Sequence, residues 1–304
     1  MIIVLLAGAI ALLALPCSAR RYGRRLHPQH WAQLIWAALM TGSVALEIGL
    51  VFLALPTALR AAGVSQLAAA CNMLLGHLAP GSAPVGWAAS ALALAIPWRA
   101  ALAYRRARLT PAAMTIEAQL GHHEVFWGHE LVVLPTPDVL AYSVQSRTQS
   151  QIVVSSHVVD QLSAEELIAV LVHEHAHLQH GHQRRLVIAT LLERTLVPLR
   201  RCTSELRLAL ERWADEEAAT HTGRPTVRRA LVRLVEPALA TSPLPAFTDA
   251  DTVVERIDAL GAPPARAPAR AVIVTRAAVF VLAGSVLAAA GGWLFDATRM
   301  LHRT

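Results

Sequence analysis

Long apolar stretches constrain this chain more than any other feature of its sequence. Four segments, at about 2–17, 31–55, 85–103 and 277–295, consist largely of aliphatic and small residues. A helix needs about 20 such residues to cross the hydrocarbon core of a bilayer. Of the 304 residues, 55% are hydrophobic and 16% are charged, whereas about 25% are charged in ordinary soluble domains. We therefore expect a multi-pass membrane protein with four transmembrane helices.

Arginines indicate how these helices are oriented. Basic groups follow the first and third apolar segments, whereas the loop after the second segment contains only Arg60. Because cytoplasmic loops carry an excess of Lys and Arg, the region after the third segment is expected in the cytosol. The two groups consist of Arg20, Arg21, Arg24 and Arg25, and of Arg105, Arg106 and Arg108.

The net charge of +6 is explained by this topology and by contact with anionic lipid headgroups. No DNA-binding motif accompanies it, so we expect the lipid bilayer as a partner and no direct contact with nucleic acid. Residues 61–83 are moderately apolar and are compatible with either an interfacial or a re-entrant segment. A further basic group is compatible with contact at the membrane surface: Arg184, Arg185, Arg200 and Arg201.

A histidine motif lies in the region between the third and fourth segments. Residues 173–177 follow the pattern HExxH, and Ser163 with Glu166 forms a capping box that predicts a helix through them. On a helix, His173 and His177 lie one turn apart on one face, so both imidazoles can bind one zinc ion. Zinc lowers the pKa of a bound water to about 7, and Glu174 beside it is suited to act as general base.

A catalytic zinc ion usually has a third protein ligand. Glu211 is the best candidate, because Asp215 follows it one helical turn later and is suited to hydrogen-bond a ligand imidazole. His180 lies too far along the first helix, and Glu205 has no acidic partner four residues on. His221 is an alternative for contact with the metal or with the oxyanion, although a surface position before a turn explains it equally well.

These motifs resemble those of the gluzincin-type integral-membrane metallopeptidases. HExxH at 173–177 followed by ExxxD at 211–215 is similar to both the BlaR/MecR antibiotic-sensor peptidases and the HtpX/Ste24 peptidases. The segment 134–155 also resembles the strands beside the active-site helix in those families. The resemblance covers about residues 110–260, and four spans around the zinc domain are more like BlaR/MecR.

The resemblance implies one Zn²⁺ per chain, bound by His173, His177 and Glu211, with Glu174 as general base and Asp215 as a supporting carboxylate. It implies a zinc endopeptidase that cleaves a protein substrate, such as a cytosolic transcriptional repressor. HtpX-like quality control of membrane proteins and a catalytically silent signalling scaffold are the alternatives. Self-association into a homo-oligomer is compatible with all three.

The predicted fold is α+β and mostly helical. Residues 1–108 form the first membrane region, with three transmembrane helices. Residues 109–270 form a cytoplasmic zinc peptidase domain, which has a break at residues 223–225 and ends in a linker rich in Pro, Ala and Arg. Residues 271–304 contain the fourth span and a short tail. The expected location is the cell membrane, with the catalytic domain in the cytosol.

Overall fold

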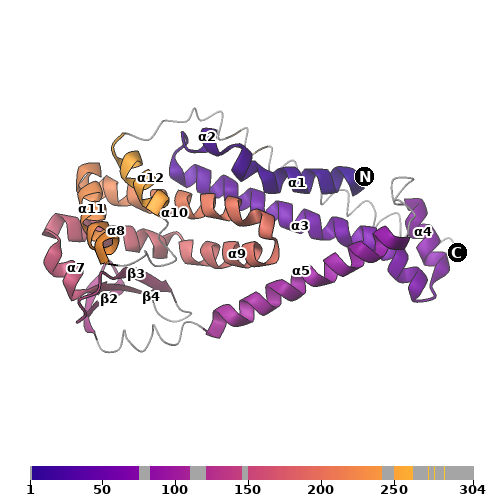
Figure 1. Ribbon diagram of the computed structural model, residues 1–304, viewed down its shortest axis with the longest axis horizontal. Coiled ribbons are helices and arrows are strands. Elements are labelled where there is room, and N and C mark those ends of the chain that lie inside the picture. The colour runs from indigo at the N-terminus through magenta and orange to yellow at the C-terminus, as the bar shows by residue number, and fades with distance from the viewer. Residues whose placement is uncertain are drawn as a thin grey trace.

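The computed structural model shows an elongated, mostly helical molecule with a small sheet near one end (Figure 1). Apolar helices extend from the opposite end toward the sheet. The structure describes residues 2–74, 83–109, 121–145, 150–241 and 250–262, together with residues 273, 277 and 284. Most of the predicted fourth span, 277–295, and of the linker after residue 262 lies outside these ranges.

The first part of the chain forms long apolar helices. Helix α3 packs against both α1 and α5. By length and composition alone, α3 and α5 are suited to cross a membrane, and α1 is a shorter apolar helix. The elements are α1 (Ile2–Ser18), α2 (Arg20–Gly23), α3 (Pro28–Ala61), α4 (Ser65–Leu74) and α5 (Ala83–Leu109). The predicted segments 2–17, 31–55 and 85–103 thus all lie in helices, and part of the 61–83 loop is helical as α4.

A four-stranded sheet follows, with the strand order β1-β2-β4-β3. Strand β4 pairs in parallel with β2 and antiparallel with β3, while β1 and β2 form an antiparallel hairpin. The β-branched run of β4 supplies the buried centre of the sheet. The strands are β1 (His122–Phe126), β2 (His129–Leu134), β3 (Ala141–Gln145) and β4 (Ser150–Ser155). The strands predicted in 134–155 are therefore present.

Helices complete this domain and cover the sheet. Leu171 and Leu178 of α8 pack on Ile152 and Val154 of the sheet. Gly223, which has a φ of +80°, separates α10 from α11 at the predicted break. The remaining elements are α7 (Ser156–Gln161), α8 (Ala164–Gln179), α9 (His182–Thr195), the 3₁₀ turn η1 (Val197–Leu199), α10 (Arg200–Thr222), α11 (Arg224–Thr241) and α12 (Ala250–Leu260).

Helices α9 and α10 form a hairpin that joins this domain to the apolar helices (Figure 1). Leu206 and Leu210 of α10 are fully buried in one cluster with Ile35 and Leu39 of α3. The Sγ of Cys202 donates to the Leu13 carbonyl of α1, at 3.3 Å. The largest apolar core of the described residues therefore lies between the two parts of the molecule.

Candidate metal centre

Helix α8 contains the HExxH motif, and both its capping box and its packing on the sheet fix its position. The Ser163 hydroxyl accepts a hydrogen bond from the Glu166 amide, and the Glu166 carboxylate accepts one from the Ser163 amide, which completes the capping box. The apolar stripe of the helix then packs on the sheet. The predicted helix is present, and His173 and His177 project from it toward α10.

His173, His177 and Glu211 each place a potential ligand atom within 4.8 Å of the others. The two Nε2 atoms are 3.1 Å apart, and the Glu211 carboxylate oxygens lie 3.5 Å from His173 Nε2 and 3.6 Å from His177 Nε2. Ligand atoms about 2.0–2.1 Å from a tetrahedral ion are about 3.3–3.4 Å apart. The three side chains are therefore close enough to share one metal ion, and two imidazoles with a carboxylate form a ligand set that zinc accepts.

Asp215 and Arg256 contact the candidate ligands His173 and Glu211. The Oδ1 of Asp215 lies 3.0 Å from His173 Nδ1, the ring nitrogen that faces away from the ligand group. Arg256, from α12, donates two hydrogen bonds to Asp215 at 2.7 and 2.8 Å, and its Nη1 lies 3.1 Å from Glu211 Oε2. A carboxylate on the second nitrogen of a ligand imidazole fixes both the ring and its tautomer. Arg256 thereby orients both acidic residues.

The pKa values of these groups follow from burial and from their partners. Burial works against the charged forms, but hydrogen bonds to Asp215 and Glu211 raise the pKa of His173 to about 10. Against the same burial penalty, Arg256 holds the pKa of Asp215 at about 2 and that of Glu211 well below its usual value. Burial lowers the pKa of His177. Both carboxylates are thus charged at neutral pH, as metal ligands and their supports must be.

Glu174 is buried on the flank of α8 between the ligand face and the sheet. Only 9% of its surface is exposed. It follows His173 directly, and at 3.6 residues per turn it lies about 100° around the helix from that ligand. Its negative charge acts to raise the pKa values of His177 and Arg256, although burial leaves the pKa of His177 lowered, so Glu174 lies electrostatically within the centre. This position suits a base that serves a reactant next to the ligand group.

His182 packs against the second ligand and was not predicted. Its Nδ1 lies 3.0 Å from His177 Nδ1, and it is fully buried against the Trp213 ring. Burial lowers the pKa of His182 to about 2, so the ring is neutral and can accept a hydrogen bond from His177. Arg256 was also missed. It follows Asp215 by 41 residues and belongs to no motif, so the sequence carries no signal for it.

The other candidates lie elsewhere. The His180 ring stacks on Trp213, and Glu205 accepts hydrogen bonds from Arg24 and Trp31. The exposed His221 contacts the ring of Trp127 and its own helix backbone. Within the described residues, the structure brings together His173, His177 and Glu211 with Asp215, as predicted from spacing. The chemical roles assigned to these residues and to Glu174 remain predictions.

Comparison with known proteins finds similarity to one peptidase family over part of the chain. The model of Peptidase family M48 matches residues 103–203, about a third of the chain. This match includes the HExxH helix and ends before Glu211. Among curated proteins, none matches this chain. The crystal structure of S. mikatae Ste24p aligns at 16% identity and a TM-score of 0.36, over 84% of this chain and 74% of that one. A TM-score this low does not establish a common fold.

Proposed function

We propose that this chain is a membrane-embedded zinc endopeptidase that hydrolyses peptide bonds. One observation carries the proposal: His173 Nε2 and His177 Nε2 lie 3.1 Å apart, and each lies 3.5–3.6 Å from one oxygen of the Glu211 carboxylate, which is close to the ligand spacing around zinc. The M48 family match over residues 103–203 supports the same reaction class. One zinc ion per chain is implied, because the described residues contain one such group.

The residues of the chain divide the work of hydrolysis. When bound, zinc supplies a Lewis acid that polarises the scissile carbonyl and acidifies water. Glu174 accepts a proton from the attacking water and delivers it to the leaving amine nitrogen. Asp215 holds the His173 ring in the tautomer that leaves Nε2 free to bind metal. Arg256 fixes Asp215 and Glu211, so the ligand set is organised before substrate arrives.

The apolar helices support a location in the membrane. Helices α3 and α5 are long and apolar enough to span a bilayer, and α1 packs beside α3. The α9–α10 hairpin carries Glu211 and Asp215 on the same helix that packs on α3. We propose a multi-pass protein of the cell membrane with the metal centre on the cytosolic side, as the arginine distribution favours.

The proposed physiological role is regulatory cleavage of a cytosolic protein, such as a transcriptional repressor. This role rests on the resemblance to BlaR/MecR sensors. HtpX-like removal of damaged membrane proteins is the second candidate role, and the M48 match is compatible with it. Quantitative proteomics of cells with a Glu174→Gln chain separates the two roles. One accumulating protein supports regulation, whereas many support quality control.

The peptidase proposal is tested with purified full-length chain in detergent. Unfolded casein is the substrate, and zinc content is measured alongside cleavage. Glu174→Gln is expected to retain zinc and to lower the rate by about 100- to 10,000-fold, because the proton acceptor is lost. Glu165→Gln, an exposed position on the same helix, is the matched control and should cleave normally. Equal cleavage by both variants would refute the proposal and would favour a catalytically silent scaffold.

A further inference from the structure

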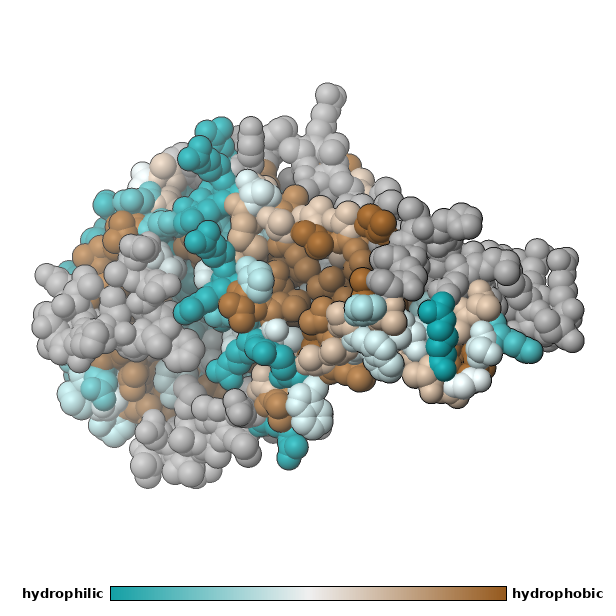
Figure 2. Space-filling model, turned by 45° about the vertical axis from the view of Figure 1, so that its right-hand side comes forward, coloured by the Kyte–Doolittle hydropathy of each residue, from teal (hydrophilic) through white to brown (hydrophobic). Residues whose placement is uncertain are grey.

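Helix α3 changes character near its middle. Within residues 28–43, all of which the structure describes, no residue is exposed, because α1 and α10 cover this half. From Val44 onward, large apolar side chains face outward, with Val44 52% and Val51 44% exposed. Figure 2 shows apolar residues gathered in the middle of the molecule, beside a band of hydrophilic residues. The first half of α3 is therefore domain core, and the second half has the surface of a lipid-facing helix.

The exposed surface of helix α5 also changes from apolar to basic along its length. Its outward apolar residues include Leu94 and Trp98, which are 72% and 67% exposed. Arg99 follows at once, and its Nη2 donates a 2.8 Å hydrogen bond to the Arg194 carbonyl near the end of α9. Tryptophan followed by arginine is typical of the membrane–water interface. The apolar surface of α5 thus ends at the level of the hairpin tip.

The tip of the α9–α10 hairpin, defined as residues 194–201, is basic and exposed. Arg194, Arg200 and Arg201 all face outward, with Arg200 78% exposed. Among the described residues, no carboxylate lies within 4.0 Å of Arg194 or Arg201. Glu193 lies 3.5 Å from Arg200 but pairs more closely with Arg207, at 2.9 Å. The tip therefore carries excess positive charge at the boundary of the apolar surface.

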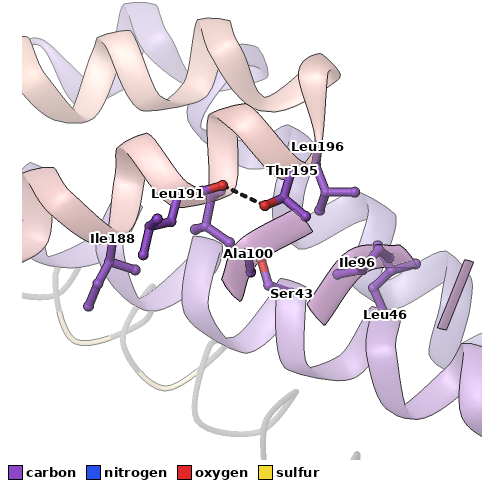
Figure 3. A pocket seen from close by; sticks show the side chains of 9 residues that line it. Ser43, Leu46, Ile96, Ala100, Ile188, Leu191, Thr195 and Leu196 are labelled. Carbon is purple, nitrogen blue, oxygen red and sulfur yellow. Dashed lines mark hydrogen bonds between the residues drawn. The ribbon is translucent and has the colours of Figure 1, made fainter. Parts of the chain in front are cut away.

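A pocket of about 190 Å³ opens beside this tip, between α3, α5 and α9 (Figure 3). Its walls are almost entirely apolar. The Thr195 hydroxyl, one of its two polar side chains, already donates to the Leu191 carbonyl at 2.7 Å. The other, the buried Ser43 hydroxyl, has no hydrogen-bond partner among the described residues, but the rest of the lining suits a hydrocarbon chain. The pocket is lined by Ser43, Leu46, Ile96, Ala100, Ile188, Leu191, Leu192, Thr195 and Leu196.

We infer that the hairpin tip binds an anionic phospholipid at the membrane surface. The headgroup phosphate pairs with the tip arginines, and an acyl chain enters the neighbouring pocket. Charge complementarity and an apolar cavity beside the same residues select this one class of ligand. The inference rests on the membrane location in the proposed function, but it does not depend on the metal or on catalysis.

Lipid binding at the hairpin tip places the membrane surface near Val44 of α3, and not near residue 31 as the sequence predicts. With spans at 31–55 and 85–103, the tip would lie within hydrocarbon, where exposed arginines are strongly disfavoured. With the surface at the tip, the span of α3 runs from Val44 to Ala61, about 27 Å at 1.5 Å per residue. A bilayer core of about 30 Å accommodates such a small mismatch at little cost. The tip arginines thus favour the shifted boundary.

The alternative boundary rests on Arg20–Arg25, but two of those arginines are engaged within the protein. Arg24 donates two hydrogen bonds to Glu205, and Arg20 pairs with both Glu205 and Glu255. Their charge is therefore largely compensated by neighbouring carboxylates. Arg21 and Arg25 of the same group are exposed and supply a matched control.

The test uses the full chain in phosphatidylcholine nanodiscs with and without phosphatidylglycerol, and bound lipid is counted by native mass spectrometry. R200Q/R201Q is expected to weaken phosphatidylglycerol binding roughly 20-fold, since each surface arginine contributes about fivefold in affinity. R21Q/R25Q removes the same charge and should change binding less than twofold. A larger loss in R21Q/R25Q, or no loss in either variant, would overturn the inference.

The pocket has its own pair of variants. Ala100→Phe fills it, whereas Ala95→Phe adds the same side chain at an exposed position of α5. We expect Ala100→Phe to lose retained lipid at an unchanged unfolding temperature, and Ala95→Phe to keep it. Equal retention would overturn the acyl-chain site. A chain that stays dispersed without detergent would contradict the membrane location itself, whatever the lipid counts show.

Discussion

The two ends of α10 differ in how their charged side chains are placed. Those of the carboxyl-terminal half that face the candidate metal centre are largely buried and paired, whereas those of the amino-terminal end are exposed. Glu211 and Asp215 face α8 and α12, where imidazoles and Arg256 neutralise them. Arg200 and Arg201, about 15–23 Å away along the helix at 1.5 Å per residue, are exposed. Paired, buried charge fixes geometry, as a metal centre requires. Exposed charge remains available to an external partner, such as the lipid headgroups in the proposed membrane contact.

Glu205 marks the transition between the two ends. It is only 5% exposed, yet it accepts hydrogen bonds from Arg24 and from the indole of Trp31. Through Glu255, the same arginine also contacts α12, the helix that carries Arg256. The N-terminal segment is therefore tied to the element that holds the metal centre, by ion pairs that are partly shielded from water.

The largest expected effect is at the metal end. Arg256→Ala leaves the buried Asp215 carboxylate without its cation, so we expect a loss of about 3–5 kcal/mol in the free energy of unfolding. Zinc affinity should fall by about 10- to 100-fold, because the supports of the ligands are lost. Chemical denaturation and zinc titration measure the two effects. Arg228→Ala, at an exposed position of α11, is the control. An effect no larger than in this control would contradict the claim that buried charge pairs stabilise this end of α10.

A smaller effect is expected at the junction. Glu205→Ala removes the acceptor of Arg24 and Trp31, and we expect a loss of about 1–3 kcal/mol. Arg20 and Arg24 retain Glu255 and access to water, which limits the loss. Zinc content should not change, because Glu205 is not a ligand. A zinc content that falls with Glu205→Ala would show that the two ends of α10 are coupled.

The metal-free protein should be sensitive to alkaline pH. The raised pKa of His173 stabilises the fold fully below its unfolded value of about 6.5, and this stabilisation is lost as pH rises through about 10. The lowered pKa of Asp215 acts below about pH 4, where its stabilisation is lost as pH falls toward about 2. After zinc removal with EDTA, the unfolding temperature should therefore decrease between pH 6.5 and 10. Asp215→Asn should flatten this decrease, and an increase in wild type would contradict the assignment.

The smallest effect is expected at the tip. Arg200→Gln should change the free energy of unfolding by less than about 0.5 kcal/mol, since exposed charges contribute little to the fold. Denaturation in neutral detergent, without anionic lipid, measures this directly. A loss comparable to that of Glu205→Ala would show that the Arg200–Glu193 contact is structural, and the contrast between the two ends would be weaker.

Much of the residue arrangement at the candidate metal centre could be predicted, because it depends on spacing within single helices. Helical spacing alone places His173 near His177, and Glu211 near Asp215. Choosing Glu211 over Glu205 was also possible, since only Glu211 has an acidic residue one turn on. Arg256 and His182 could not be predicted, because their contacts depend on how α12 and α9 pack and not on a periodic pattern.

Hydropathy alone does not fix where the membrane-spanning part of α3 begins. Residues 31–43 of α3 are as apolar as a membrane span, but α1 and α10 cover them. Hydropathy reports how strongly a residue prefers apolar surroundings to water, and these surroundings can be either lipid or protein core. The hairpin of α9 and α10 was equally hidden, since its helices carry charged residues at the tip and apolar residues only on the faces that pack.

The zinc content of three purified chains tests the central assignment most directly. Elemental analysis should find one zinc ion per wild-type chain, and X-ray absorption at the zinc edge should show two imidazoles among nitrogen and oxygen ligands at about 2.0–2.1 Å. Glu174→Gln should give the same spectrum, and Glu211→Gln should lose most of the zinc. A wild-type chain without zinc, or a Glu211→Gln chain that retains it in an unchanged environment, would contradict the proposed centre.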